Sequence, residues 1–409
     1  MDHEILYLLL IFALLVIPRM LQRFKIPAPL TCLFFGISAT WIPQIQIHDP
    51  ALPLLSIFGI SSLFLFAGLD VDMGLLRKSS IPLIGYLLTY AGLLFAAGWV
   101  VTYYWHFSWQ ETGLLMLALF TPSTGFIVDS LKTLALDDDE RLSIINIAVA
   151  GEMFALVGLF IIQQSANPTQ MLKASGYLFA LLVVLPFLFV AMGRWVVAHA
   201  PGSEFSLLVM VGLIAAYATY ELGVYYLVGA FIAGLVARLL RQRMPLLASD
   251  ENLHAVSLFA SFFVPFYFFK AGTSIPVQAF SLASLGLGVA LTAGIVPIRF
   301  IFTWLQRKLF FRDSNRSSTR VSIALTPTLV FTLVMASLLH ERFHIPDVLY
   351  GGLILYAALT TLMPYLWIPS VTPAATPAPP DTAAADTTHT ETTLANPSPP
   401  SQTTPNTHD

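Results

Sequence analysis

Long apolar stretches separated by short polar breaks run through most of the chain. Thirteen of them, each of about 17–25 residues, are long enough to cross a bilayer as a helix. They lie at about 4–21, 28–43, 51–69, 81–105, 110–131, 142–163, 171–196, 204–222, 224–240, 254–271, 281–305, 318–340 and 347–368. This pattern predicts an all-α polytopic membrane protein with about 13 transmembrane helices.

The composition supports the same class. Of the 409 residues, 56% are hydrophobic and 11% are charged, whereas a soluble domain carries about 25% charged residues. The single cysteine, Cys32, excludes an intramolecular disulfide and a cysteine-based metal cluster. No basic run suggests a nucleic-acid partner, so the lipid bilayer is the partner that the composition implies.

The basic residues predict the orientation. Most of the 20 Lys and Arg residues fall in the breaks after the odd-numbered stretches. The positive-inside rule then places the N-terminus outside the cell and, with an odd helix count, the C-terminus in the cytoplasm. The expected location is the cytoplasmic (inner) membrane. Residues 370–409 are rich in Pro, Thr and Ala and lack Lys and Arg, which predicts a disordered cytoplasmic tail.

Two of the stretches are interrupted in the same way. The fifth reads "LLMLALFTPSTGFIVDSL", with Thr121-Pro122-Ser123 near its middle, and the twelfth reads "RVSIALTPTLVFTLVMAS", with Thr326-Pro327-Thr328. Proline removes a backbone hydrogen bond and leaves polar groups that lipid does not tolerate. The two stretches are seven apart and so enter from opposite sides, which is typical of a transporter built from inverted repeats. The alternative is two ordinary proline kinks.

An acid stands in the middle of the sixth stretch, "INIAVAGEMFALVGLFI". Glu152 is flanked there by apolar residues on both sides. A charge at this depth costs a few kcal/mol and marks ion or proton pathways. The alternative is a neutral Glu that hydrogen-bonds a neighbouring helix.

Four segments together resemble a known family. They are "LFLFAGLDVDMGLLRKS", with Asp70 and Asp72 at its acidic positions, "LALFTPSTGFIVDSL", "LGVYYLVGAFIAGLVARLL" and "FFVPFYFFKAGTSI". In this order they resemble the motifs of the monovalent cation:proton antiporters, the superfamily of sodium/proton exchangers and potassium-efflux antiporters. The resemblance covers about residues 5–368.

This resemblance implies a homodimeric, elevator-type exchanger in a transmembrane antiporter domain at 1–369. Its core helices would lie at about 81–163 and 281–368, with the two broken helices crossed inside them. The dimerisation helices would lie at about 4–69 and 204–271. The resemblance also implies a transporter with no enzymatic activity and no cofactor.

The resemblance places the ion-binding acid at Glu152 and a membrane cation at Arg299. Glu152 would bind either a proton or a partly dehydrated Na⁺ or K⁺, and competition for one carboxylate would couple the two fluxes. One acid predicts an electroneutral exchange. Further oxygen ligands are expected from Thr121, Ser123, Thr124 and Thr328, and from carbonyls beside Pro122 and Pro327.

Three charged residues carry alternatives. Arg299 pairs with a core carboxylate or a helix end, or its side chain extends to the membrane surface. Lys270 either pairs with the carboxylate of Glu152 when the cation is absent, or lies at the extracellular end of its helix. Asp129 attracts cations below Pro122, or it caps a helix or pairs with Lys132. The acidic run at 137–140 is expected to be a solvated loop.

The chain also departs from the family pattern, at Gly151 before the acid and at Val330 before Phe331. The alternatives to an antiporter are a potassium-efflux or channel-like conductor on the same scaffold and a transport-inactive sensor. "HERFH", from His340 to His344, matches the H-E-x-x-H zinc-protease pattern. No convincing third ligand accompanies it, and we expect no resident metal.

Overall fold

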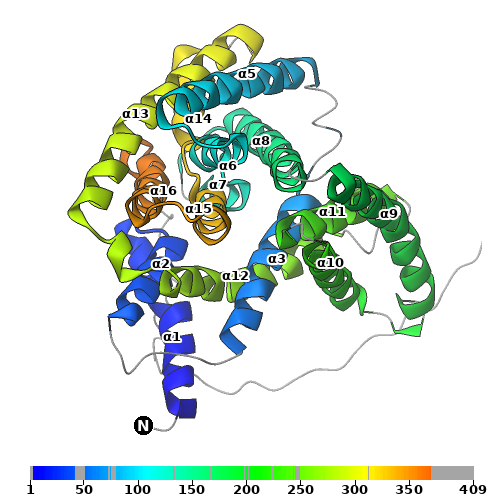
Figure 1. Ribbon diagram of the computed structural model, residues 1–409. Coiled ribbons are helices and arrows are strands. Elements are labelled where there is room, and N and C mark those ends of the chain that lie inside the picture. Colours follow the sequence, from blue (N-terminus) through cyan, green and yellow to red (C-terminus); the bar gives the residue numbers. More distant parts are fainter. Residues whose placement is uncertain are drawn as a thin grey trace, which may run out of the picture. The chain divides into compact units, whose positions relative to one another are not determined.

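The computed structural model describes residues 3–41, 51–71, 74, 80–131, 134–165, 168–197, 199–200, 202–222, 225–242, 244, 249–311 and 313–369. Its regular elements in this part are helices (Figure 1). The predicted tail at 370–409 and Asp72 of the predicted acidic motif lie outside the described residues.

The long helices follow one another with short connections. They are α1 (His3–Leu21), α2 (Ala28–Thr40), α3 (Ala51–Leu69), α5 (Ser80–Trp105), α6 (Trp109–Phe120), α7 (Thr124–Leu131), α8 (Asp138–Gln164), α9 (Pro168–Met192), α10 (Glu204–Glu221), α11 (Tyr226–Leu239), α12 (Asp250–Thr273), α13 (Leu282–Gln306), α14 (Asn315–Ala324), α15 (Leu329–Phe343) and α16 (Asp347–Trp367). Short 3₁₀ and π turns are η1 (Gln22–Phe24), η3 (Gly193–Val197), η4 (Leu240–Gln242), η5 (Val277–Ala279) and η6 (Arg307–Phe311).

These helices confirm the predicted all-α polytopic membrane protein. Each of the 13 apolar stretches corresponds to one helix, or to one broken pair in the case of α6–α7 and α14–α15. Within the described residues, ten helices are long and apolar enough to cross a membrane, or up to 11 when a bent pair counts as one span. Two more, α2 and α11, are apolar but have only 13 and 14 residues. The count of 13 therefore depends on these short helices.

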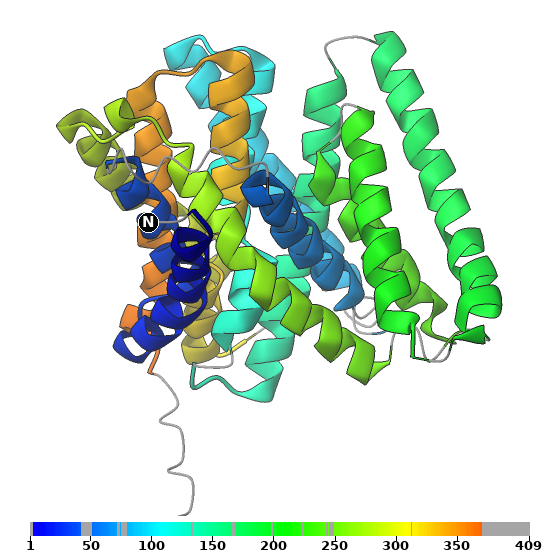
Figure 2. The same ribbon diagram turned by 90° about the horizontal axis from the view of Figure 1, so that it is seen from below.

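The helices pack in two neighbourhoods. In one, α3 and α12 contact each other, α3 also contacts α11, and α12 also contacts α2. In the other, α16 contacts α13 and α15, and α6 contacts α5, α8 and α15. Figures 1 and 2 show α9 and α10 side by side, with α9 on the outside. The α3–α7 contact joins the two neighbourhoods.

Close approach in the first neighbourhood depends on glycine. A Cβ added to Gly68 of α3 would overlap the backbone carbonyl of Phe231 in α11, and one added to Gly234 would overlap that of Leu65. Membrane helices use such small residues to bring their backbones into contact, because lipid provides no hydrophobic driving force between helices. This contact explains why the predicted motif "GAFIAG" needs its second glycine.

The acidic run at 137–140 forms the N-cap and first turn of a helix, so the predicted loop is wrong, although residues 137–139 are exposed as predicted. Asp137 is the N-cap of α8 and forms a reciprocal capping box with Glu140. Glu140 is buried and lies 3.4 Å from the guanidinium of Arg320 on α14. Acidic side chains are stabilised at a helix N-terminus because they accept from its free N–H groups.

Candidate functional site

Both Thr-Pro segments interrupt their helices as predicted. α6 ends at Phe120 and α7 begins at Thr124, so residues 121–123 are extended rather than helical. On the other side, α14 ends at Ala324 and α15 begins at Leu329, with an angle of 43° between the two. Each break leaves backbone groups without the partners that a continuous helix would supply.

The two breaks meet in the interior. The backbone N–H of Ser123 donates to the carbonyl of Pro327 at 2.9 Å. The hydroxyl of Thr332, in the first turn of α15, donates to the carbonyl of Ala118 at the end of α6, at 2.7 Å. These two bonds connect the broken helices directly, so parts of the chain about 200 residues apart form one polar centre.

The side chain of Arg299, on α13, donates hydrogen bonds to the carbonyls at the C-terminal end of α14. Its guanidinium donates to the carbonyls of Thr326 at 2.7 Å and Leu325 at 2.9 Å, and to the hydroxyl of Tyr356 at 3.2 Å. The side chain is only 7% exposed. A cation is favourable at a helix C-terminus because the terminal carbonyls carry partial negative charge. Of the alternatives for Arg299, the structure shows the contact with a helix end.

Glu152 lies beside the first break. It is 2% exposed on α8, and its carboxyl group lies next to the hydroxyl and backbone N–H of Thr124. Three buried side-chain oxygens, on α8 and in the first break, form no hydrogen bond of normal geometry with the described residues, although the Thr124 hydroxyl lies close to the carboxyl group: Glu152 Oε2, Ser123 Oγ and Thr124 Oγ1. Buried polar atoms are nearly always hydrogen-bonded, so buried oxygens without a hydrogen-bond partner require an explanation.

Gly151 allows this arrangement. A Cβ at residue 151 would lie 3.3 Å from Cγ and 3.4 Å from Cδ of Pro122. The proline ring of the break therefore packs directly on the backbone of α8, one residue before the acid. A larger side chain would displace the break from Glu152.

The other predicted ligands have different surroundings. Thr121 Oγ1 accepts from the hydroxyl of Tyr90 at 3.4 Å, and the hydroxyls of Thr328 and Thr360 share a hydrogen bond of 3.2 Å. Both threonines are fully buried. The structure thus leaves Ser123 and Thr124 with unused hydroxyl oxygens and places Thr124 beside the acid, whereas Thr121 and Thr328 have protein partners.

The expected carbonyl ligands beside Pro327 are also engaged. The carbonyl of Pro327 accepts from Ser123, and those of Leu325 and Thr326 accept from Arg299. The sequence predicts the carbonyls beside Pro327 as cation ligands. In the structure they instead stabilise the contact between residues 121–123 and 325–328, which we call the crossing.

A cavity of about 340 Å³ lies next to the first break. It is lined by Gly125 and Phe126 of α7, Val330 of α15 and Leu63 of α3, with Arg19 of α1 and Gln22 of η1 among its polar residues. Glu152, Ser123 and Thr124 are not among the residues that line it. Val330 contributes an apolar wall to this cavity.

Two other predicted site residues lie elsewhere or outside the description. Lys270 is half-buried in the last turn of α12 and forms no ion pair with any described residue. Asp129 belongs to α7, but its side chain lies outside the described residues.

The zinc-protease pattern does not form a zinc site in the described chain. α15 ends at Phe343, and His344 adopts a left-handed conformation with φ of 53°, so the two histidines do not share a helical face. His340 stacks on Tyr350 with 4.6 Å between the ring centroids. No group of three or more metal-ligating side chains occurs among the described residues.

Sequence reasoning missed three residues that hold the crossing. Thr332, Tyr356 and Thr360 all hydrogen-bond across it and are fully buried. Their signal in the sequence is faint: a threonine hydroxyl in an apolar helix often bonds back to its own turn, and a tyrosine in such a helix is equally compatible with ordinary packing.

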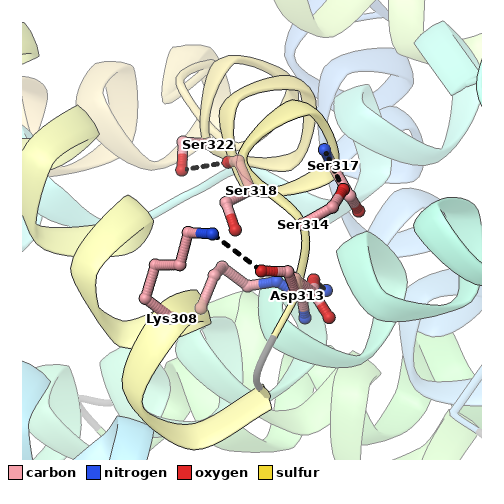
Figure 3. Close-up of polar contacts among 7 residues, drawn as sticks. Lys308, Asp313, Ser314, Ser317, Ser318 and Ser322 are labelled. Atoms are coloured by element: carbon pink, nitrogen blue, oxygen red, sulfur yellow. Dashed lines mark hydrogen bonds and ion pairs between the residues drawn. The ribbon is translucent and has the colours of Figure 1, made fainter.

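The start of α14 is anchored by a polar cluster (Figure 3). Ser314 is the N-cap and accepts from the backbone N–H of Ser317 at 3.2 Å. Lys308 donates to the carbonyl of Asp313 at 2.9 Å, and Arg307 pairs with the Asp313 carboxylate. The half-helix α14 is thus fixed at both ends, here and at Arg299.

Comparison with known proteins identifies a family model that matches this chain and solved structures that resemble its fold. A family model described as "sodium/hydrogen exchanger, transmembrane" matches residues 9–371. The fold is similar to a structure of the sodium proton antiporter MjNhaP1 from Methanocaldococcus jannaschii at pH 8, with a TM-score of 0.61, 16% identity, and coverage of 88% of this chain and 94% of that one. A second MjNhaP1 structure, from electron microscopy, gives a TM-score of 0.55 at 16% identity and covers 90% and 95% of the two chains. No curated protein sequence gives a significant match.

Proposed function

The chain belongs to the sodium/hydrogen exchanger family, and from that premise we propose that Glu152 is the shared binding site at which it exchanges a monovalent cation for a proton. Family membership supports cation:proton antiport in a membrane. What we propose beyond family membership is which acid binds the ions, which oxygens are the other ligands, and how the transport cycle runs.

One observation carries it: buried side-chain oxygens of Glu152, Ser123 and Thr124 have no hydrogen-bond partner of normal geometry among the described residues, and Thr124 lies beside the acid. Hard cations take oxygen ligands, and a carboxylate with two hydroxyls is such a set. A partly dehydrated Na⁺ would satisfy the three oxygens together, whereas a proton on Glu152 would neutralise the acid alone. Burial penalises the charged carboxylate, so it favours occupancy by one or the other.

The cycle follows from this competition. Glu152 releases its proton on one side and binds the cation, then carries the cation to the other side and exchanges it there. Since a single acid serves both ions, one proton moves per monovalent cation and no net charge crosses the membrane. Arg299 is engaged by carbonyls at the end of α14, so it adds a constant charge to the moving part.

The moving part in this proposal contains the second packing neighbourhood, α5–α8 and α13–α16, with the crossed breaks at its centre. It moves as an elevator against α1–α3 and α10–α12, which form the homodimer contact. α6–α7 and α14–α15 are corresponding parts of two inverted repeats. The N-terminus faces the outside of the cytoplasmic membrane and the C-terminus the cytoplasm.

Everted vesicles with an imposed pH gradient test the proposal. Adding Na⁺, K⁺ or Li⁺ in turn should collapse the gradient with at least one of them. Glu152→Gln should abolish the collapse. Glu251→Gln, which changes an exposed acid in the first turn of α12, is the matched control and should exchange at the wild-type rate. Unchanged exchange in Glu152→Gln would refute the site.

The same vesicles separate the antiporter from a conductor. Clamping the membrane potential at zero should leave the initial rate unchanged if the exchange is electroneutral. A flux that follows the potential, without proton movement, indicates a channel-like protein. No cation response at all in a correctly inserted protein indicates a transport-inactive sensor.

A further inference from the structure

We propose that Tyr356 and Thr360 of α16 are positioning residues that hold the two broken helices in the register required for cation binding. This inference rests on the proposed site at Glu152. α16 supplies no ligand in that proposal, and its residues act through the backbone of the crossing.

Tyr356 connects the two breaks. It is fully buried, and its hydroxyl donates to the carbonyl of Leu119 in the last turn of α6 at 2.6 Å. The same oxygen accepts from Arg299, whose guanidinium binds the carbonyls that end α14. One phenol group therefore ties the C-terminal end of α6 to the C-terminal end of α14.

Thr360 extends the same contact by one helical turn. Its hydroxyl shares a hydrogen bond with that of Thr328 at 3.2 Å, and its carbonyl accepts from the Thr326 hydroxyl at 3.5 Å. Residues four apart lie on the same face of a helix. The face of α16 that carries Tyr356 and Thr360 thus contacts both sides of the second break and the end of the first.

The position of this face determines the geometry at the acid. Leu119 lies four residues before Ser123 and five before Thr124, the two residues of the first break whose hydroxyl oxygens are unused within the described chain; Thr124 is the one beside Glu152. Their distance from Glu152, which belongs to α8, depends on where α6 ends. The Leu119 carbonyl accepts this hydrogen bond from Tyr356. The carbonyl is therefore not available to bind the cation in place of the proposed ligands.

The test is the dependence of exchange on Na⁺ concentration in vesicles of purified protein, or on K⁺ or Li⁺ concentration if that is the transported cation. Tyr356→Phe removes the hydroxyl and keeps the ring. We expect the half-saturating cation concentration to rise at least threefold while the maximal rate stays within twofold, because looser ligands weaken binding without removing the acid. Thr360→Val, which keeps the side-chain volume, should show the same split, and it alone decides the test if Tyr356→Phe does not insert.

Two neighbours in α16 are matched controls. Tyr350→Phe removes a buried hydroxyl that interacts with Ser337 rather than with the crossing. Thr361→Val removes a hydroxyl that bonds only to Ala357 of its own helix. Both should leave the half-saturating concentration and the maximal rate within twofold of wild type.

Three results would overturn the inference. These are unchanged half-saturation in Tyr356→Phe and Thr360→Val, a loss of maximal rate without a change in half-saturation, and an equal rise in the controls. Failure of the underlying function is distinct, since it appears as normal exchange in Glu152→Gln. Loss of exchange in Glu152→Gln with unchanged saturation in the α16 variants refutes the positioning role alone.

Discussion

Replacing Arg299 by glutamine should destabilise the folded protein strongly. The shorter amide cannot reach the carbonyls of Leu325 and Thr326, which the guanidinium now contacts at 2.9 and 2.7 Å. A buried polar group left without a partner costs about 1–3 kcal/mol, so two carbonyls cost about 2–6 kcal/mol. Removing a buried charge recovers part of its desolvation, about 1–2 kcal/mol of this cost, which leaves about 1–4 kcal/mol.

The measurement is the midpoint of thermal unfolding of the purified protein in detergent, at one scan rate. At about 2 °C per kcal/mol, Arg299→Gln should lower the midpoint by about 2–8 °C. Arg241→Gln is the control, because Arg241 is 39% exposed and pairs with Asp250, which is 85% exposed. Such surface pairs contribute about 0–1 kcal/mol. Equal midpoints in the two variants would show that the carbonyls at the end of α14 do not need the guanidinium.

Three further predictions concern single positions. Gly151→Ala should slow exchange at least threefold, because its Cβ would press on Pro122, whereas Gly158→Ala, with only ordinary contacts at 3.6 Å, should not; equal rates would contradict the packing argument. Gly234→Leu should prevent stable accumulation in the membrane, since its side chain would overlap the backbone of α3, while Gly176→Leu, with open space around it, should accumulate normally on immunoblots. His340→Ala should retain full exchange and insensitivity to zinc chelators, because no described residues form a metal site around it; loss of exchange on chelation would reopen the metal hypothesis.

Much of the fold could be predicted from the sequence because the bilayer imposes a local rule. Each crossing segment must be apolar and must satisfy its own backbone groups, so length and hydropathy located the 13 segments. The Thr-Pro segments at Pro122 and Pro327 located the breaks by the same logic, since proline removes the helical bond wherever the chain folds. The boundary at 137–140 was missed because a run of acids is compatible with both a loop and a capped helix start.

The sequence by itself therefore determined the class of protein, the number of apolar segments, the two interruptions and the buried acid, all of which depend on neighbours along the chain. Only the tertiary structure decided which oxygens beside the breaks have partners. Tyr356 and Leu119 are 237 residues apart, and Arg299 reaches Thr326 from another helix. Hydrogen bonds across such distances depend on how helices pack. For this reason the sequence could not distinguish the five candidate ligands from one another. In the described chain, Glu152, Ser123 and Thr124 have unused oxygens. Thr121 and Thr328 have protein partners.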